Sequence, residues 1–100
     1  NDLVVDFIFV NNFAHANLEN ANFKNASLLF VNFYSTNLTD ADLSGADLRK
    51  AFLGNADLSN ANLSGANLFD VNLSGADLSG AVYDENTNLK CLNHPTCLDK

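Results

Sequence analysis

Apolar residues recur at every fifth position along most of this chain, with polar residues between them. From residue 11 to residue 85 the sequence divides into fifteen five-residue units in one register. The middle residue of a unit is Leu in eleven units, Phe in three and Tyr in one, and the residue two places earlier is Ala in eleven and Val in two. A fixed short repeat of this kind indicates a solenoid, in which each unit packs on its neighbours.

A period of five fits neither a straight helix nor a straight strand. On a helix each step of five turns the apolar residue by about 140°, so no apolar stripe forms. On a strand an odd period sends successive Leu residues to opposite faces. The conflict disappears if the chain turns a corner once per unit, because the small residue and the Leu, two apart, then point inward together.

The fifth residue of a unit has the chemistry of a turn. It is Gly, Asn, Asp or Ser in eleven of the fifteen units, and these residues tolerate unusual backbone angles. Four corners close a square, so one coil takes twenty residues and the repeats make about four coils. Two inner stacks are then predicted: Phe23, Leu43, Leu63 and Tyr83 on one face, and Phe13, Phe33, Leu53 and Leu73 on another.

Units such as ADLSG (41–45), ADLRK (46–50) and ANLSG (61–65) resemble the A(D/N)LXX repeat of the pentapeptide-repeat family. The AVYDENT ending at 81–87 is similar to endings of cyanobacterial members, and the chain as a whole resembles small cyanobacterial and chloroplast members. The resemblance implies an all-β solenoid, a right-handed quadrilateral β-helix. It also implies a non-enzymatic structural or protein-interaction module. The alternative is a DNA mimic that inhibits or protects an enzyme such as DNA gyrase, as the family's quinolone-resistance proteins do.

The two ends depart from the repeat within what we take as a single domain, residues 1–100. Residues 1–10 are apolar, and counting back in fives places Leu3 and Ile8 inward but also Asp6, so an irregular first coil is expected. Residues 86–100 are expected to form a short helical cap of two turns divided by Pro95. The chain begins at Asn1 and not at Met, which we interpret as processing or trimming.

Charge and hydropathy restrict the partners. Twelve acids against five bases give a net charge of −7, which disfavours nucleic acid and anionic membranes. No apolar run reaches the length of about eighteen residues that spans a bilayer. A protein partner is therefore expected, with no nucleic acid and no membrane span.

Cys91 and Cys97 are the only cysteines, and both fall in the expected cap. A disulfide between them would hold two short turns together, and it would indicate an oxidising compartment such as a periplasm or thylakoid lumen. With His94 the spacing also offers three ligands to zinc, although a fourth is not evident. Free thiols, with a cytoplasmic location, are the remaining alternative.

No catalytic or cofactor-binding constellation is evident. His15 and His94 lie at opposite ends of the repeats, and the serines occupy one turn position where backbone hydrogen bonding accounts for them. The Asp residues alternate with Asn at equivalent solvated places, whereas acid–base catalysis needs carboxylates in unlike environments. A coil filled by its own side chains also leaves no cleft. We therefore expect no enzyme activity, no cofactor and no metal.

Apolar residues at outward positions stand out against a polar surface. Residues twenty apart share an edge, which aligns Leu29, Arg49 and Phe69, with Phe30 and Lys50 beside them and Phe52 past the corner. We call these six residues the ridge and interpret them as a contact surface, because aromatic residues and Arg are favoured at interfaces. The opposing interpretation is that scattered exposed apolar residues are normal and that Phe69 stacks on Arg49. Candidate partners are an acidic protein or a second copy presenting Asp57 and Asp77. A homodimer could also form through a coil end or the Phe30/Phe69 edge.

Overall fold

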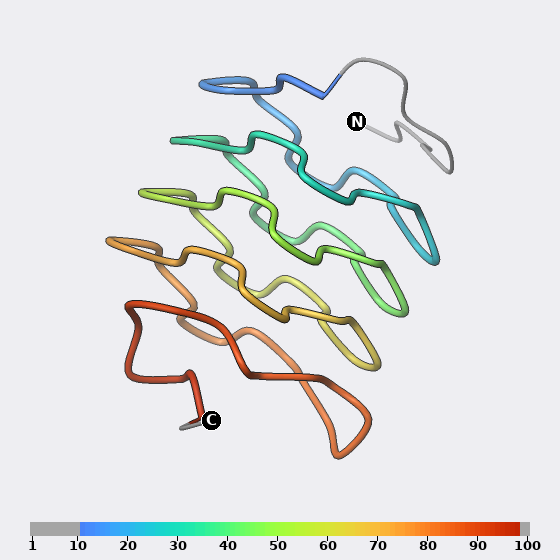
Figure 1. Cartoon of the computed structure of the whole chain (residues 1–100). Coiled ribbons are helices and arrows are strands. Elements are labelled where there is room, and N and C mark those ends of the chain that lie inside the picture. Colours follow the sequence, from blue (N-terminus) through green and yellow to red (C-terminus); the bar gives the residue numbers. More distant parts are fainter. Residues whose placement is uncertain (1–10, 99–100) are drawn as a thin grey trace.

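The computed structural model describes residues 11–98, and there the chain forms a column of stacked coils (Figure 1). This part of the chain contains no helix and no strand longer than one bridged residue. The second residue of each unit forms a parallel β-bridge with a residue of the next coil, and the two partners are 20 residues apart in every pair but Asn67↔Asn88. One coil therefore takes twenty residues and has four bridged sides.

The bridges define four coils and four faces. The coils are residues 12–31, 32–51, 52–71 and 72–91, numbered 1 to 4, and the bridge of Leu92 to Asn72 begins a fifth. The faces are named by their bridged residues: face 1 has Asn12, Asn32, Phe52, Asn72 and Leu92; face 2 has Asn17, Asn37, Asp57 and Asp77; face 3 has Asn22, Asp42, Asn62 and Val82; face 4 has Ser27, Asp47, Asn67 and Asn88.

A unit with Asn or Asp at its second position can satisfy all of its backbone N–H groups, as residues 41–45 show. The N–H groups of Asp42, Leu43 and Gly45 donate to carbonyls of the neighbouring coils, at 2.9, 2.8 and 2.8 Å, and that of Ala41 donates to the preceding unit. The fourth N–H, of Ser44, donates to Oδ1 of Asp42 at 3.0 Å. The outward Asn or Asp thus has a structural role, because it accepts the one N–H that no carbonyl reaches.

The corners require left-handed backbone. The fifth residue of every unit from His15 to Gly80 has a positive φ, between 55° and 73°. Gly, Asn and Asp adopt this conformation at little cost, whereas other side chains crowd the following carbonyl. The composition of the fifth position is therefore set by the square shape of the coil.

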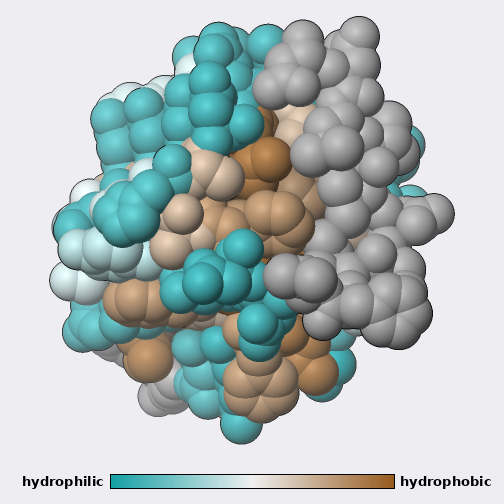
Figure 2. Space-filling view, turned by 90° about the horizontal axis from the view of Figure 1, so that it is seen from above, coloured by the Kyte–Doolittle hydropathy of each residue, from teal (hydrophilic) through white to brown (hydrophobic). Residues whose placement is uncertain are grey.

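The interior is filled by the middle and first residues of the units. The Leu side chains at the middle position of the units from Leu28 to Leu73, together with Phe23 and Phe33, are at most 1% exposed. Seen from the end where the described chain begins, hydrophilic residues line much of the rim and apolar residues gather toward the middle (Figure 2). Thr36 occupies a small inward position, and its hydroxyl donates to the Phe13 carbonyl at 2.8 Å, so this buried polar group is satisfied.

The prediction for Tyr83 is wrong, because this side chain is 44% exposed and does not join the inner stack of Phe23, Leu43 and Leu63. After Val82 the chain departs from the path of the bridged coil and rejoins it at Asn88. Oδ1 of Asp84 and Oγ1 of Thr87 accept the N–H of Gly65 at 3.1 and 3.2 Å, in place of a backbone carbonyl. The extra residue that this detour needs shifts Tyr83 outward.

The expected helical cap is also wrong for residues 86–98, which contain no helix. Thr87, Asn88 and Leu89 repeat the small–Asn–Leu order of a unit and continue the coil. Thr87 is buried and donates to the Leu63 carbonyl at 3.0 Å, while Asn88 accepts the N–H of Lys90 at 2.9 Å. Asn88 follows Val82 by six positions and Leu92 follows Asn88 by four, where the repeat uses five and five, so coil 4 keeps its length of twenty.

Residues 93–98 turn back across the end of coil 4 (Figure 1). Cys91 occupies a buried inward position, and its disulfide to Cys97 has a Cα–Cα distance of 5.0 Å. His94 Nε2 lies 3.2 Å from the Ala76 carbonyl, and the N–H of Leu98 donates to the Leu89 carbonyl at 2.8 Å. A tail that covers the last coil therefore exists, but it is irregular. The expectations for residues 1–10, including Leu3, Asp6 and Ile8, concern residues outside the described range.

Candidate protein-interaction surface

Two columns of side chains run along the corner between face 4 and face 1. Backbone hydrogen bonds from Phe30 to Arg49, from Lys50 to Phe69 and from Asp70 to Lys90 fix the register of successive coils. The fourth-position column is therefore Leu29, Arg49, Phe69 and Lys90, and the fifth-position column is Phe30, Lys50 and Asp70. Leu29, Phe30 and Phe69 are 40%, 58% and 37% exposed, so the apolar members of the ridge are open to solvent.

Phe30 of coil 1 and Lys50 of coil 2 contact each other between adjacent coils. Both occupy turn positions with positive φ, 64° and 61°, where a bulky side chain is strained. The Lys50 Nζ lies 5.8 Å from the centroid of the Phe30 ring, within the range of a cation–π contact. Two unfavourable backbone conformations thus place an aromatic ring and a cation side by side on the surface.

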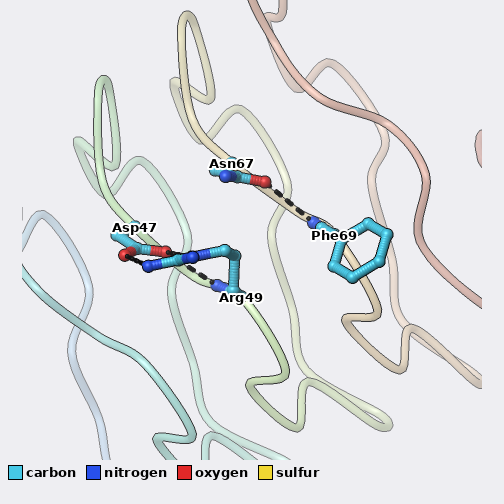
Figure 3. Close-up of polar contacts among 4 residues, drawn as sticks. All are labelled: Asp47, Arg49, Asn67 and Phe69. Carbon is cyan, nitrogen blue, oxygen red and sulfur yellow. Dashed lines mark hydrogen bonds and ion pairs between the residues drawn. The ribbon is translucent and has the colours of Figure 1, made fainter.

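Arg49 is directed toward Asp47 of its own unit. Its Nε and Nη2 donate to the two carboxylate oxygens at 2.8 and 2.7 Å, and hydrogen bonding to Arg49 lowers the pKa of Asp47 below its ordinary value of 3.8. Figure 3 shows the guanidinium group extending to Asp47 while the Phe69 ring extends from the next coil in another direction. The positive charge of Arg49 is therefore largely balanced within its own unit.

Phe52 lies apart from the other ridge residues. Its ring stacks on Tyr34, with centroids 5.5 Å apart, and Tyr34 in turn contacts His15 edge-on. A Cβ atom at Gly54 would lie 3.1 Å from the Phe52 ring and 3.3 Å from Tyr34, so the two rings rest where Gly54 has no side chain. The ridge thus consists of a corner group and a separate aromatic group on face 1.

Charge is segregated by face within residues 11–98. The units of face 1 carry no Asp, Glu, Lys or Arg, and those of face 2 carry only acids. Three of the four described basic residues lie at the corner of face 4, where Asp47 and Asp70 accompany them. The acids of face 2 are Glu19, Asp40, Asp57 and Asp77.

Two residues of this surface were missed from the sequence. Lys90 joins the fourth-position column only because the coil continues past the insertion after Val82. The Thr87–Asn88–Leu89 triplet was the available signal. The repeat places Tyr34 at an outward position, but its contact with Phe52 depends on side-chain directions that the period does not specify.

The described residues offer little for chemistry. They enclose no pocket, and no group of three or more His, Cys, Asp or Glu among them is placed to hold a metal. The disulfide uses both thiols of the Cys91–His94–Cys97 arrangement, so the two sulfurs are not zinc ligands in this state. The described residues form no helix that is long and apolar enough to cross a membrane.

The outward carboxylates predict an acid-sensitive stability. Hydrogen bonds from Ser59 and Ser79 lower the pKa of Asp57 and Asp77, and Arg49 does so for Asp47. Because the folded-state pKa lies below the unfolded one, the stabilisation is present above about pH 4 and is lost as the pH falls further. Urea denaturation over a pH series should show this loss. It should be shallower in D47N/D57N/D77N, whose amides still accept the N–H bonds, and an unchanged pH dependence would contradict the assignment.

Comparison with known proteins identifies the repeat. The family model for pentapeptide repeats matches residues 12–40 and 46–82, which together exceed half of the chain. The chain belongs to the pentapeptide-repeat family. The fold of this family, a right-handed quadrilateral β-helix, agrees with the twenty-residue register of the bridges.

Two solved pentapeptide-repeat structures are similar along most of the chain. HetL of the cyanobacterium Nostoc sp. strain PCC 7120, involved in heterocyst differentiation regulation, is 35% identical over 92% of this chain and 40% of its own, with a TM-score of 0.76. A protein from the thylakoid lumen of Arabidopsis thaliana is 35% identical over 71% of this chain and 57% of its own, with a TM-score of 0.62. This pentapeptide-repeat chain thus spans roughly half the length of these relatives.

More distant structures add only the repeat itself. The fluoroquinolone-resistance protein QnrB1 matches at 18% identity with a TM-score of 0.35, values that carry no argument about function. No curated protein sequence matches this pentapeptide-repeat chain significantly.

Proposed function

We propose that this pentapeptide-repeat chain is a non-enzymatic module that binds protein through the ridge of Leu29, Phe30, Arg49, Lys50, Phe52 and Phe69. The observation that carries the proposal is the backbone strain at Phe30 and Lys50. Of the fourteen left-handed turn residues from His15 to Gly80, only these two and His15 are not Gly, Asn, Asp or Ser. Strained backbone of this kind is found preferentially at functional sites.

Folding does not account for these side chains. Each non-Gly residue in a left-handed turn costs roughly 1 kcal/mol, less for Asn and Asp. Phe30 returns little through burial because it is 58% exposed. An exposed cation–π contact with Lys50 is worth about 0.5–1 kcal/mol, which at most offsets one of the two strained turns. A binding role would explain why aromatic and cationic residues occupy these places.

The proposal predicts that restoring the repeat removes binding without harming the fold. In the variant F30N/F52N/F69S each of the three replaced aromatic residues becomes an amino acid that is common at its position in the repeat. We expect an unchanged or higher melting temperature, because Asn relieves the turn strain at position 30 and at position 52 supplies the missing acceptor for the Gly54 N–H. Thermal denaturation followed by circular dichroism measures this.

To compare binding, the affinity-tagged parent and variants are each incubated with a lysate of the natural source, and the retained proteins are identified. The matched control is T39S/N60D/N62D, which changes the same three repeat positions on faces 2 and 3. Proteins retained by the parent and the control should be lost with the ridge variant. If the ridge variant folds and retains them all, the ridge is ordinary surface; if it unfolds, the side chains are structural.

The DNA-mimic alternative is less well supported by the charges. Four coils stacked at about 4.8 Å span roughly 19 Å, along which duplex DNA carries about eleven phosphates. Face 2, the purely acidic face, carries four carboxylates. A gyrase supercoiling assay tests this alternative directly, since a mimic would inhibit the enzyme or protect it from a quinolone.

We infer an oxidising compartment, such as a periplasm or thylakoid lumen, for this chain. The Cys91–Cys97 disulfide supports the inference, since disulfides persist under oxidising conditions. The thylakoid-lumen location of the similar Arabidopsis protein is compatible with it.

A further inference from the structure

The surface formed by the two columns at the corner of face 4 is complementary to the same surface of a second copy in antiparallel orientation. We propose that two copies of this chain associate edge to edge and antiparallel, about a two-fold axis that passes between coils 2 and 3. The inference rests on the proposed function, since it names a second copy as the protein that the ridge binds. Such an isologous interface uses the same patch on both subunits.

A two-fold axis across the column reverses the order of the coils but keeps the fourth-position and fifth-position columns in their places. Coil 2 of one copy then faces coil 3 of the other. Lys50 lies opposite Asp70 of the second copy, and Asp70 lies opposite its Lys50. Each dimer thus gains two oppositely charged pairs from one column, with Lys50 exposed and Asp70 partly buried at their turn corners.

The fourth-position column is matched in the same arrangement. Arg49 of coil 2 lies opposite Phe69 of the second copy, and Leu29 of coil 1 lies opposite its Lys90. Asp47 holds the guanidinium end of Arg49, which leaves the aliphatic stem beside the column to cover an aromatic ring. The methylene groups of the Lys90 side chain can cover Leu29 of the second copy in the same way. Phe69 and Leu29 therefore meet hydrocarbon, and neither cation has to be buried.

Other registers are unfavourable. An axis at the level of coil 2 places Lys50 against its own copy, and an axis at coil 3 does the same for Asp70. A parallel pair, related by an axis along the corner, exchanges the two columns and places Lys50 opposite Arg49 of the second copy. Like charges at close range cost free energy, so the register between coils 2 and 3 is the one that pairs opposite charges.

Charge also favours a second copy over an acidic partner. Asp47 accompanies Arg49, and Asp70 shares the column of Lys50, so the corner carries as many acids as cations across coils 2 and 3. The acidic face 2 of a second copy offers only polar residues and Gly at its outward positions, so Leu29 and Phe69 would find no apolar contact there. The reversed ridge supplies both the charge and the apolar surface.

The interface is narrow, because a corner four coils long presents less surface than the roughly 1,200–2,000 Å² of a standard interface. We therefore expect a weak dimer that forms as concentration rises. Physiological salt is the appropriate condition, since it screens the repulsion between two chains of net charge −7.

Sedimentation equilibrium of the full chain over a range of concentrations tests the proposal by charge reversal. K50D and D70K should each be monomeric, because each places like charges in both pairs. Both should fold, since Asp and Lys already occupy left-handed turns at residues 40, 50 and 70. An equimolar mixture of the two should form heterodimers with parental affinity, and K50D/D70K should regain the homodimer.

The outcomes separate this proposal from the proposed function. A parent chain that stays monomeric, single variants that still dimerise, or a mixture no stronger than its components would each overturn the antiparallel dimer. The lysate comparison with F30N/F52N/F69S does not depend on dimerisation. A monomeric parent whose ridge variant loses a retained protein would therefore refute the dimer and leave the binding role of the ridge in place.

Discussion

Replacing Leu58 with Asp is expected to unfold the chain. Leu58 is 0% exposed and lies in the inner column of face 2 between Leu38 and Leu78. A carboxylate there has no partner, and burying it costs several kcal/mol, a large part of the roughly 5–15 kcal/mol that holds a domain folded. Because each coil is stabilised by its contacts with the next, loss of coil 3 would also deprive coil 4 of its neighbour and coil 2 of one of its two neighbours.

Far-UV circular dichroism and size-exclusion chromatography would report the unfolding. The matched control is the adjacent change D57N, which keeps an oxygen to accept the Ser59 N–H now bonded at 3.0 Å. This control should melt like the parent at neutral pH. A soluble L58D chain with the parental melting temperature would contradict the assignment of the middle position to the interior.

Reduction of the Cys91–Cys97 disulfide is expected to lower the free energy of unfolding by about 2 kcal/mol. The bond joins a buried position in coil 4 to the tail that crosses its end. Without it, the hydrogen bonds from His94 to Ala76 and from Leu98 to Leu89 must hold the tail alone. The chain should remain folded, because these residues lie beyond the inner stacks of coils 1 to 3.

Urea denaturation with and without reductant measures this difference. C91A/C97A is the control: Ala suits the inward position at 91, and this variant should match the reduced parent and ignore reductant. Intact mass after aerobic purification should show the loss of two hydrogens relative to the dithiol. Two free thiols, or equal stability of the oxidised and reduced chains, would contradict the role assigned to the bond.

The sequence by itself determined the coil. A period of five with Leu at its centre and turn residues at its end allows one way to bury the central Leu of every unit, so the four faces and the column members up to residue 80 followed from counting. The aromatic exceptions Phe30, Phe52 and Phe69 were visible for the same reason, because each breaks a strict pattern. These are local properties, because the residues that determine them recur within each five-residue unit.

Only the tertiary structure decided what depends on neighbours in other coils. Thr87 bonds to Leu63, and that long-range match sets the register after the insertion, brings Lys90 to the corner and turns Tyr83 outward. The direction of a surface side chain was equally inaccessible. Arg49 turns to Asp47 and Phe52 to Tyr34 because these partners are within reach in the folded column. The period fixes which way a residue faces, but it does not specify the partner of its side chain, which lies in the same unit for Arg49 and in the neighbouring coil for Phe52.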